Sequence, residues 1–181
     1  MDCINLFDKS FKLYLNEAEI EKQIVRIANE LNENLKDENP LFLGILNGCF
    51  MFAGELFKHL NIKCEISFLK IASYQGTETS EKIKELIGFN ENIKGRTVVI
   101  LEDIVDTGHT INYLENLLLI KEPKKILITT LLYKPDKYQY KDLYNVDYCS
   151  FEIPNNFIVG YGLDYNGKGR NFKDIYTLGD L

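Results

Sequence analysis

The sequence has few of the side chains from which zinc sites and disulfide frameworks are built. Its 181 residues include two histidines and four cysteines. No two cysteines lie close enough in the chain to form a Cys-x-x-Cys pair, so a His/Cys zinc site has almost no ligands to draw on. A chain of this length buries enough apolar surface to fold without disulfides. We therefore expect free thiols and a reducing, cytoplasmic location.

Positive charge and long hydrophobic runs are also scarce. Lys and Arg number 21 against 27 Asp and Glu, a net charge of -6, so the chain lacks the broad positive field that binds nucleic acid without specificity. The uncharged run 41–54 is shorter than the roughly 20 residues of a membrane helix, and Asn47-Gly48 interrupts it. No basic segment precedes an apolar stretch at the N-terminus. We expect no nucleic-acid partner, no membrane segment and no secretory signal.

Repeats, low-complexity tracts and Pro/Gly-rich linkers are absent, which predicts a single domain. After an extended lead-in, Asn16 and Glu19 form a capping-box pattern for a helix that ends before Pro40. Further helical segments are expected at 50–60 and 111–120. Strands are expected at 41–46, 64–74, 97–101, 125–133, 147–152 and 157–161. This alternation predicts an α/β domain with a parallel sheet.

Ligands of parallel sheets bind at the carboxyl ends of the strands, which directs attention to the residues after Leu46, Leu101 and Tyr133. The sharpest pattern is the strand 97–101, which leads through Glu102 and Asp103 into a predicted loop, 102–110, and then a helix.

The segment Asp106-Thr107-Gly108-His109-Thr110 is suited to hold a phosphate, because a helix N-terminus offers unpaired amides and a positive dipole. A phosphate there would repel Glu102 and Asp103, so we expect these acids to face hydroxyl groups or a metal. The two standard nucleotide-binding motifs do not occur in the sequence. There is no GxxxxGK[ST], and 167–172 lacks the third glycine of GxGxxG.

An apolar strand, two acids, two apolar residues and Asp-Thr-Gly-x-Thr make this segment resemble the type I phosphoribosyltransferases. Further matches follow in the family's order, and between Leu41 and Leu178 the chain is similar to the hypoxanthine-guanine phosphoribosyltransferases. These matches are Leu46-Asn47-Gly48, Ser73-Tyr74, Lys134-Pro135-Asp136, the run Phe157–Tyr165 and Arg170.

The resemblance implies the type I phosphoribosyltransferase fold. We expect a central, mostly parallel twisted sheet flanked by helices, with a small hood from the terminal segments and a flexible lid loop. Residues 1–181 would form one domain, with an N-terminal helical segment at 1–40, a lid at 75–88 that Ser73 and Tyr74 introduce, and a base-binding hood at 134–181. A lid suits this chemistry because it excludes water from a reactive sugar.

The resemblance also implies an activity in purine salvage. The 5-phosphoribosyl group of phosphoribosyl pyrophosphate would pass to hypoxanthine or guanine, giving IMP or GMP and pyrophosphate. Residues 106–110 would hold the 5′-phosphate, while Glu102 and Asp103 would engage the ribose hydroxyls directly or through Mg²⁺. Asp106 matches the family's proposed general base.

The remaining matches imply contacts with pyrophosphate, a second Mg²⁺ and the base. Asn47 and Gly48 would present amides to pyrophosphate, although many relatives have lysine where this chain has Asn47. Arg170 would grip pyrophosphate, and Asp164 would bind the second Mg²⁺ and contribute to the purine site. Lys134 would donate to the purine 6-oxo group and so disfavour adenine. The base would stack on Phe157 and meet backbone groups of Ile158.

Other interpretations stay open on the sequence alone. A xanthine-preferring phosphoribosyltransferase is compatible with Lys134, and an RNA-binding regulator can retain this fold without catalysis. The regulator is less well supported, because such a protein should show a basic face. Relatives are dimers or tetramers, so a homodimer or homotetramer is expected.

Overall fold

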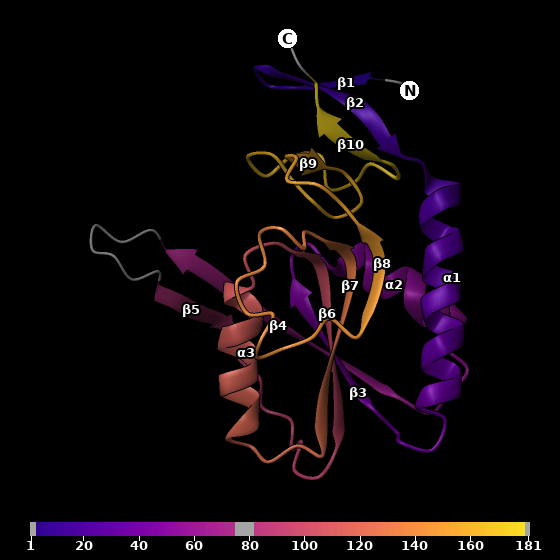
Figure 1. The fold of residues 1–181 in the computed structure, drawn as a ribbon, viewed down its shortest axis with the longest axis vertical. Helices are drawn as coiled ribbons and strands as arrows, with labels where there is room; N and C mark the ends of the chain where they lie inside the picture. The colour runs from indigo at the N-terminus through magenta and orange to yellow at the C-terminus, as the bar shows by residue number, and fades with distance from the viewer. Residues whose placement is uncertain (1–2, 75–81, 180–181) are drawn as a thin grey trace.

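The computed structural model describes residues 3–74 and 82–179, which form a large central sheet with a smaller sheet beyond one end of it (Figure 1). The central sheet has the strand order β5-β4-β3-β6-β7-β8. Its strands are β3 (Leu41–Leu46), β4 (Glu65–Tyr74), β5 (Lys82–Ile87), β6 (Thr97–Val105), β7 (Lys125–Tyr133) and β8 (Tyr148–Glu152). Neighbours from β4 to β8 pair in parallel, and β5 pairs antiparallel to β4. The predicted mostly parallel sheet is confirmed.

Helices cover both faces of this sheet. The helices α1 (Glu17–Asn34) and α2 (Phe50–His59) pack on one face, and α3 (His109–Leu119) packs on the other (Figure 1). Strand β3 contributes Phe42 to the first core and Leu43 to the second, as expected for a strand buried on both faces. The domain therefore has three layers.

The start of α1 shows why the chain turns into a helix there. The Glu19 amide donates to Asn16 Oδ1 at 3.0 Å, and the Asn16 amide donates to Glu19 Oε2 at 2.9 Å. These reciprocal bonds satisfy helix-end donors. The predicted apolar stripe is fully buried against the sheet; it comprises Ile20, Ile24, Ile27, Leu31 and Leu35.

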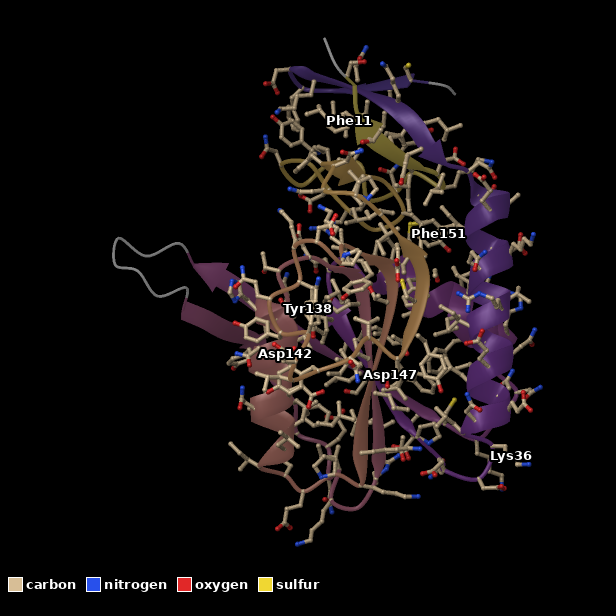
Figure 2. The ribbon with its side chains drawn as sticks, in the orientation of Figure 1. Phe11, Lys36, Tyr138, Asp142, Asp147 and Phe151 are labelled. Carbon is tan, nitrogen blue, oxygen red and sulfur yellow. The ribbon has the colours of Figure 1, made fainter. Side chains whose placement is uncertain are left out.

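The smaller sheet is the predicted hood. Its order is β1-β2-β10-β9, formed by β1 (Cys3–Leu6), β2 (Lys9–Leu15), β10 (Ile175–Leu178) and β9 (Ile158–Val159). Neighbouring strands are antiparallel, so β2, near the start of the chain, pairs directly with β10, near its end. Phe11 of β2 is fully buried in this sheet's own core, well away from Tyr138 near α3 (Figure 2).

The structure divides the chain differently from the sequence prediction in three places. The hood takes β1 and β2 from the segment 1–40, whereas β8, within 134–181, belongs to the central sheet. Strand β6 continues to Val105, because Glu102 stays in register with Thr130 of β7; the expected loop at 102–105 is wrong. Part of the expected lid, 82–87, is strand β5, and 75–81 lie outside the described residues.

In the described ranges no helix combines the length and the apolar character that crossing a bilayer requires.

Candidate active site

The carboxyl ends of β3 and β6 open into one cavity of about 460 Å³. Residues from the distant loop after β9 complete its wall. Most of the site residues expected from the sequence line this cavity: Asn47, Gly48, Glu102, Asp103, Asp106, Thr107, Gly108, His109, Thr110, Asp164 and Arg170. The structure thus brings together residues from three separate motifs, at the sheet edge where α/β ligands bind.

The loop 106–110 ends in the N-terminus of α3, as expected. Gly108 is the N-cap, with φ of 88°, and no side chain caps the helix there. A Cβ on Gly108 would lie 2.3 Å from the Tyr138 ring, so glycine is required both by the backbone conformation and by this close contact. The first-turn amides have no acidic side chain beside them and line the cavity. Such a turn is a ready anion site.

Glu102 and Asp103 are adjacent acids that no basic side chain contacts within the described residues. Glu102 is only 5% exposed, and in the described part of the chain neither acid has an ion pair. Burial, and then the neighbouring Asp103, raise the pKa of Glu102 well above its ordinary value. Burial also raises the pKa of Asp103, partly offset by its bond from the Ile104 amide and by Arg170. Two adjacent carboxylates, Glu102 buried and Asp103 half-buried, suit a hard divalent cation.

The turn after β3 packs tightly on these acids. A Cβ on Gly48 would lie 1.6 Å from Asp103 Oδ2, and a Cβ on Gly162 would lie 2.0 Å from the Gly48 carbonyl oxygen. No side chain fits at either position. The turn at Asn47-Gly48, whose Leu46–Asn47 peptide bond is cis, is therefore enclosed between Asp103 and the loop at Gly162.

Asp106 lies between two lysines. Lys134 Nζ is 3.1 Å from Asp106 Oδ2, and Lys137 Nζ is 3.2 Å from Asp106 Oδ1. Lys134 is 6% exposed, and its amide donates to the Val105 carbonyl at 2.9 Å, which ties the end of β7 to the end of β6. The residues predicted as general base and purine donor are thus in direct contact.

Asp164 and Arg170 form a second ion pair in the cavity wall. Arg170 Nη2 is 2.5 Å from Asp164 Oδ1, and Arg170 Nη1 donates to the Gly162 carbonyl at 2.7 Å. Glu102, Asp103 and Asp164 do not gather ligand atoms within 4.8 Å of one another.

The predicted base-stacking residue lies in the hood rather than in the cavity wall. Phe157 is 46% exposed, and its ring contacts Phe11 and Tyr165 at centroid distances of 6.2 and 5.8 Å. The next residue, Ile158, is buried in β9. An exposed aromatic ring supported by two others is a suitable stacking surface.

Three residues near the phosphate loop were missed by the sequence reasoning. Lys137 holds Asp106, Tyr138 packs on Gly108, and Tyr140 Oη lies 2.9 Å from Nδ1 of His109. The tyrosine-rich segment after β7 was a signal that aromatic contacts form there, but its partners depend on the fold. Ser73 and Tyr74 end β4 opposite Ile83 and Lys82 of β5; the rest of the expected lid to 81 is outside the described residues.

Comparison with known proteins accords with this geometry. The phosphoribosyl transferase domain family matches residues 11–166. The hypoxanthine-guanine phosphoribosyltransferase of Streptococcus pyogenes is 38% identical over 168 residues, 92% of each chain. The one from Bacillus subtilis is 36% identical with the same coverage. A crystal structure of such an enzyme from Bacillus anthracis superposes with a TM-score of 0.85 and 32% identity, covering 92% of this chain and 97% of that one.

These matches extend over nearly the whole chain and include the strand ends that build the cavity. The chain therefore belongs to the phosphoribosyltransferase family, among the hypoxanthine-guanine phosphoribosyltransferases.

Proposed function

We propose that this protein transfers the 5-phosphoribosyl group of phosphoribosyl pyrophosphate to N9 of hypoxanthine or guanine, giving IMP or GMP and pyrophosphate. One observation carries the proposal. An uncapped helix N-terminus, a pair of adjacent carboxylates and an arginine line a single cavity, beside a lysine that pairs with an aspartate. A sugar with an anion at each end needs this combination of donors and acceptors.

The 5′-phosphate binds at the amides of 106–110, with hydroxyl donors from Thr107 and Thr110. Pyrophosphate binds on the opposite side of the sugar, at the Asn47-Gly48 turn and Arg170. Arg170 is held by Asp164 and the Gly162 carbonyl, so its guanidinium is oriented before substrate arrives.

Glu102 and Asp103 face the ribose hydroxyls and stabilise the positive charge that develops on the sugar as the bond to pyrophosphate breaks. They are also the residues to hold Mg²⁺, with Asp164 for a second ion, because these carboxylates provide the oxygen ligands that this ion prefers. When bound, Mg²⁺ neutralises charge on the leaving pyrophosphate.

The purine binds between the hood and the end of β7. Phe157 stacks on the base, the backbone of Ile158 meets its exocyclic edge, and Lys134 donates to the 6-oxo oxygen. Asp106 accepts the proton from the attacking ring nitrogen. Lys134 Nζ lies 3.1 Å from Asp106 Oδ2. The hydrogen-bond donor and the general base therefore hold each other in position beside the purine. Ser73 and Tyr74 lead into a lid that excludes water during the reaction.

We further propose that the protein is cytoplasmic and that it forms a homodimer or homotetramer. All four cysteines are free, which accords with a reducing compartment. The exposed side chains of Leu119 and Ile120 at the end of α3 offer an apolar surface for contact between copies. Light scattering after size-exclusion chromatography measures the oligomeric state.

A Mg²⁺-dependent assay with phosphoribosyl pyrophosphate and each of four bases tests the proposed reaction. We expect nucleotide to form from hypoxanthine and guanine and none to form from adenine. The rate with xanthine, compared with the rates for hypoxanthine and guanine, gives the order of preference among the three bases. Faster reaction with xanthine than with either other base would replace the proposal with a xanthine enzyme. No product from any base, with the folded protein still binding phosphoribosyl pyrophosphate, would favour an RNA-binding regulator.

A further inference from the structure

A second group of metal-binding side chains lies outside the active-site cavity, between α1 and α2. In the described part of the chain, Glu21, Glu55 and His59 place one ligand atom each within 4.8 Å of the others. We propose that these three residues form a Zn²⁺ site that bridges the two helices.

Helical spacing creates the core of this site. Glu55 and His59 stand four residues apart on α2, so they lie on the same face one turn apart. Glu21 stands on α1, which packs beside α2 against the same face of the central sheet. The three ligands therefore come from two helices whose positions the core already fixes.

The distance between the two α2 ligands matches zinc coordination. Glu55 Oε1 and His59 Nε2 are 3.4 Å apart. In a tetrahedral site with metal–ligand bonds of about 2.0–2.1 Å, neighbouring ligand atoms lie roughly 3.3–3.4 Å apart. The separation of these two atoms is therefore the one that a shared zinc ion requires.

The imidazole is available for a metal. Although 31% of its side chain is exposed, His59 Nε2 itself is buried beside Glu55 Oε1 and forms no hydrogen bond among the described residues. Lys58 pairs with the other carboxylate oxygen of Glu55, Oε2, which leaves Oε1 directed at His59. Burying a ring nitrogen without a hydrogen bond destabilises the folded protein, and coordination to a metal would offset this cost.

The end of α2 is held in place by a residue of α1. Asn32 donates from Nδ2 to the His59 carbonyl at 3.0 Å and accepts from the Asn61 amide at 2.9 Å. These bonds fix the backbone that carries His59 relative to α1. A site built on anchored helices loses little conformational entropy when it binds a metal.

The charge around the group also favours a cation. Glu17, Glu21 and Glu55 line one cavity with Lys58 and Lys173, so carboxylates outnumber ammonium groups. Burial, and then Glu55, Glu17 and Glu21, raise the pKa of the nearby Tyr161. The imidazole ligand selects zinc over magnesium and calcium, which prefer sites made of oxygen alone. Three protein ligands leave a fourth position for water.

Cobalt(II), the usual spectroscopic substitute for zinc, tests the proposal on metal-free full-length protein. Tetrahedral cobalt with a nitrogen ligand absorbs strongly in the visible range, whereas six-coordinate cobalt on oxygen ligands, as at Glu102 and Asp103, absorbs weakly. We expect wild-type protein to develop the strong band, and zinc to abolish it by displacement. Calorimetric titration of zinc should give one more bound equivalent for wild type than for Glu21→Gln or His59→Gln.

The matched control is Glu33→Gln, an exposed substitution on α1 that removes the same charge outside the group. It should keep the band and the wild-type zinc stoichiometry. Melting temperatures in chelator establish that each variant is folded. The proposal is overturned if wild type shows no strong band, or if Glu21→Gln and His59→Gln retain it with unchanged zinc stoichiometry.

Discussion

Lys134 and Asp106 join the ends of two neighbouring strands through an ion pair of 3.1 Å. Lys134 follows β7 directly, and Asp106 follows β6. The lysine is buried, and the carboxylate with which it pairs also contacts Lys137. The residue proposed to read the base and the residue proposed to take its proton are therefore coupled, and variants at the two positions must be compared with each other.

Replacing Asp106 with asparagine keeps the size of the side chain and removes its basicity. We expect kcat to fall by about 10²–10⁴-fold, the range for loss of a general base, while phosphoribosyl pyrophosphate binds nearly as before. Steady-state kinetics and a direct binding titration separate the two effects. Asp142→Asn, an exposed substitution on the segment before β8 (Figure 2), serves as the control. Unchanged turnover in Asp106→Asn would refute the base assignment.

Replacing Lys134 with alanine removes a charged hydrogen bond to the purine. Because such bonds contribute about 1.5–3 kcal/mol, we expect KM for guanine to rise roughly 10- to 100-fold. Lys137→Ala is the matched control: it removes the same charge beside Asp106, from a side chain that is 37% exposed. Its KM for guanine should stay within about threefold of wild type. Equal effects of the two substitutions would mean that the base binds elsewhere.

Replacing Gly48 with alanine tests the close approach of the β3 turn to Asp103. The added Cβ would lie 1.6 Å from Asp103 Oδ2, so the turn or the carboxylate must move. We expect phosphoribosyl pyrophosphate turnover to fall at least tenfold. Gly54→Ala, inside α2 with nothing within 4 Å of its added Cβ, should instead raise the free energy of unfolding by about 0.5–1 kcal/mol. Wild-type activity in Gly48→Ala would contradict the enclosure described for this turn.

Glu115 on α3 is expected to make stability depend on pH. It is 7% exposed, and burial, followed by Asp147, raises its pKa from 4.5 to about 7. Below pH 4.5 the group is protonated in both the folded and the unfolded states. As pH rises towards 7 the unfolded state loses its proton first, so the free energy of unfolding falls, and the loss is complete above 7.

Glu115→Gln should therefore be more stable than wild type at pH 8, by up to about 3 kcal/mol, and equal to it near pH 4.5. Urea unfolding across this range measures the difference. Asp142→Asn should show no such pH-dependent gain, since its carboxylate is exposed (Figure 2). A constant difference between Glu115→Gln and wild type at all pH values would contradict the raised pKa.

Local patterns were sufficient to predict the parallel strands of the central sheet, although β5 had been assigned to the expected lid. The bounds of β3 and β7 agree with the prediction because each strand consists mostly of apolar residues, and Pro40 precedes the first while Lys134-Pro135 follow the second. The capping pair Asn16 and Glu19 marked the start of α1 for the same reason: its bonds are local. The turn from β6 into α3 was also predicted, since Gly108 and helix-entry residues follow a buried strand.

Features that depend on distant partners were not predictable from local patterns. Strand β6 continues through Glu102 because β7 supplies its partner, although charged residues usually indicate a loop. The pairing within the hood was not predictable, because β10 is held by β2 and β9, which lie far from one another in the sequence. The contact between Lys137 and Asp106 depends on how the segment after β7 turns, which no spacing in the sequence reveals.

The pairing of β2 with β10 has a consequence for synthesis on the ribosome. The amide of Leu178 donates to the carbonyl of Phe157 at 2.9 Å, so the last strand also fixes the proposed stacking residue. A nascent chain that has not yet supplied Ile175–Leu178 leaves β2 without its neighbour and Phe157 without this bond. Pairing between opposite ends of a chain is slow to form. The central sheet can thus assemble during translation. The hood, which carries the proposed stacking residue Phe157, is completed only after β10 leaves the exit tunnel.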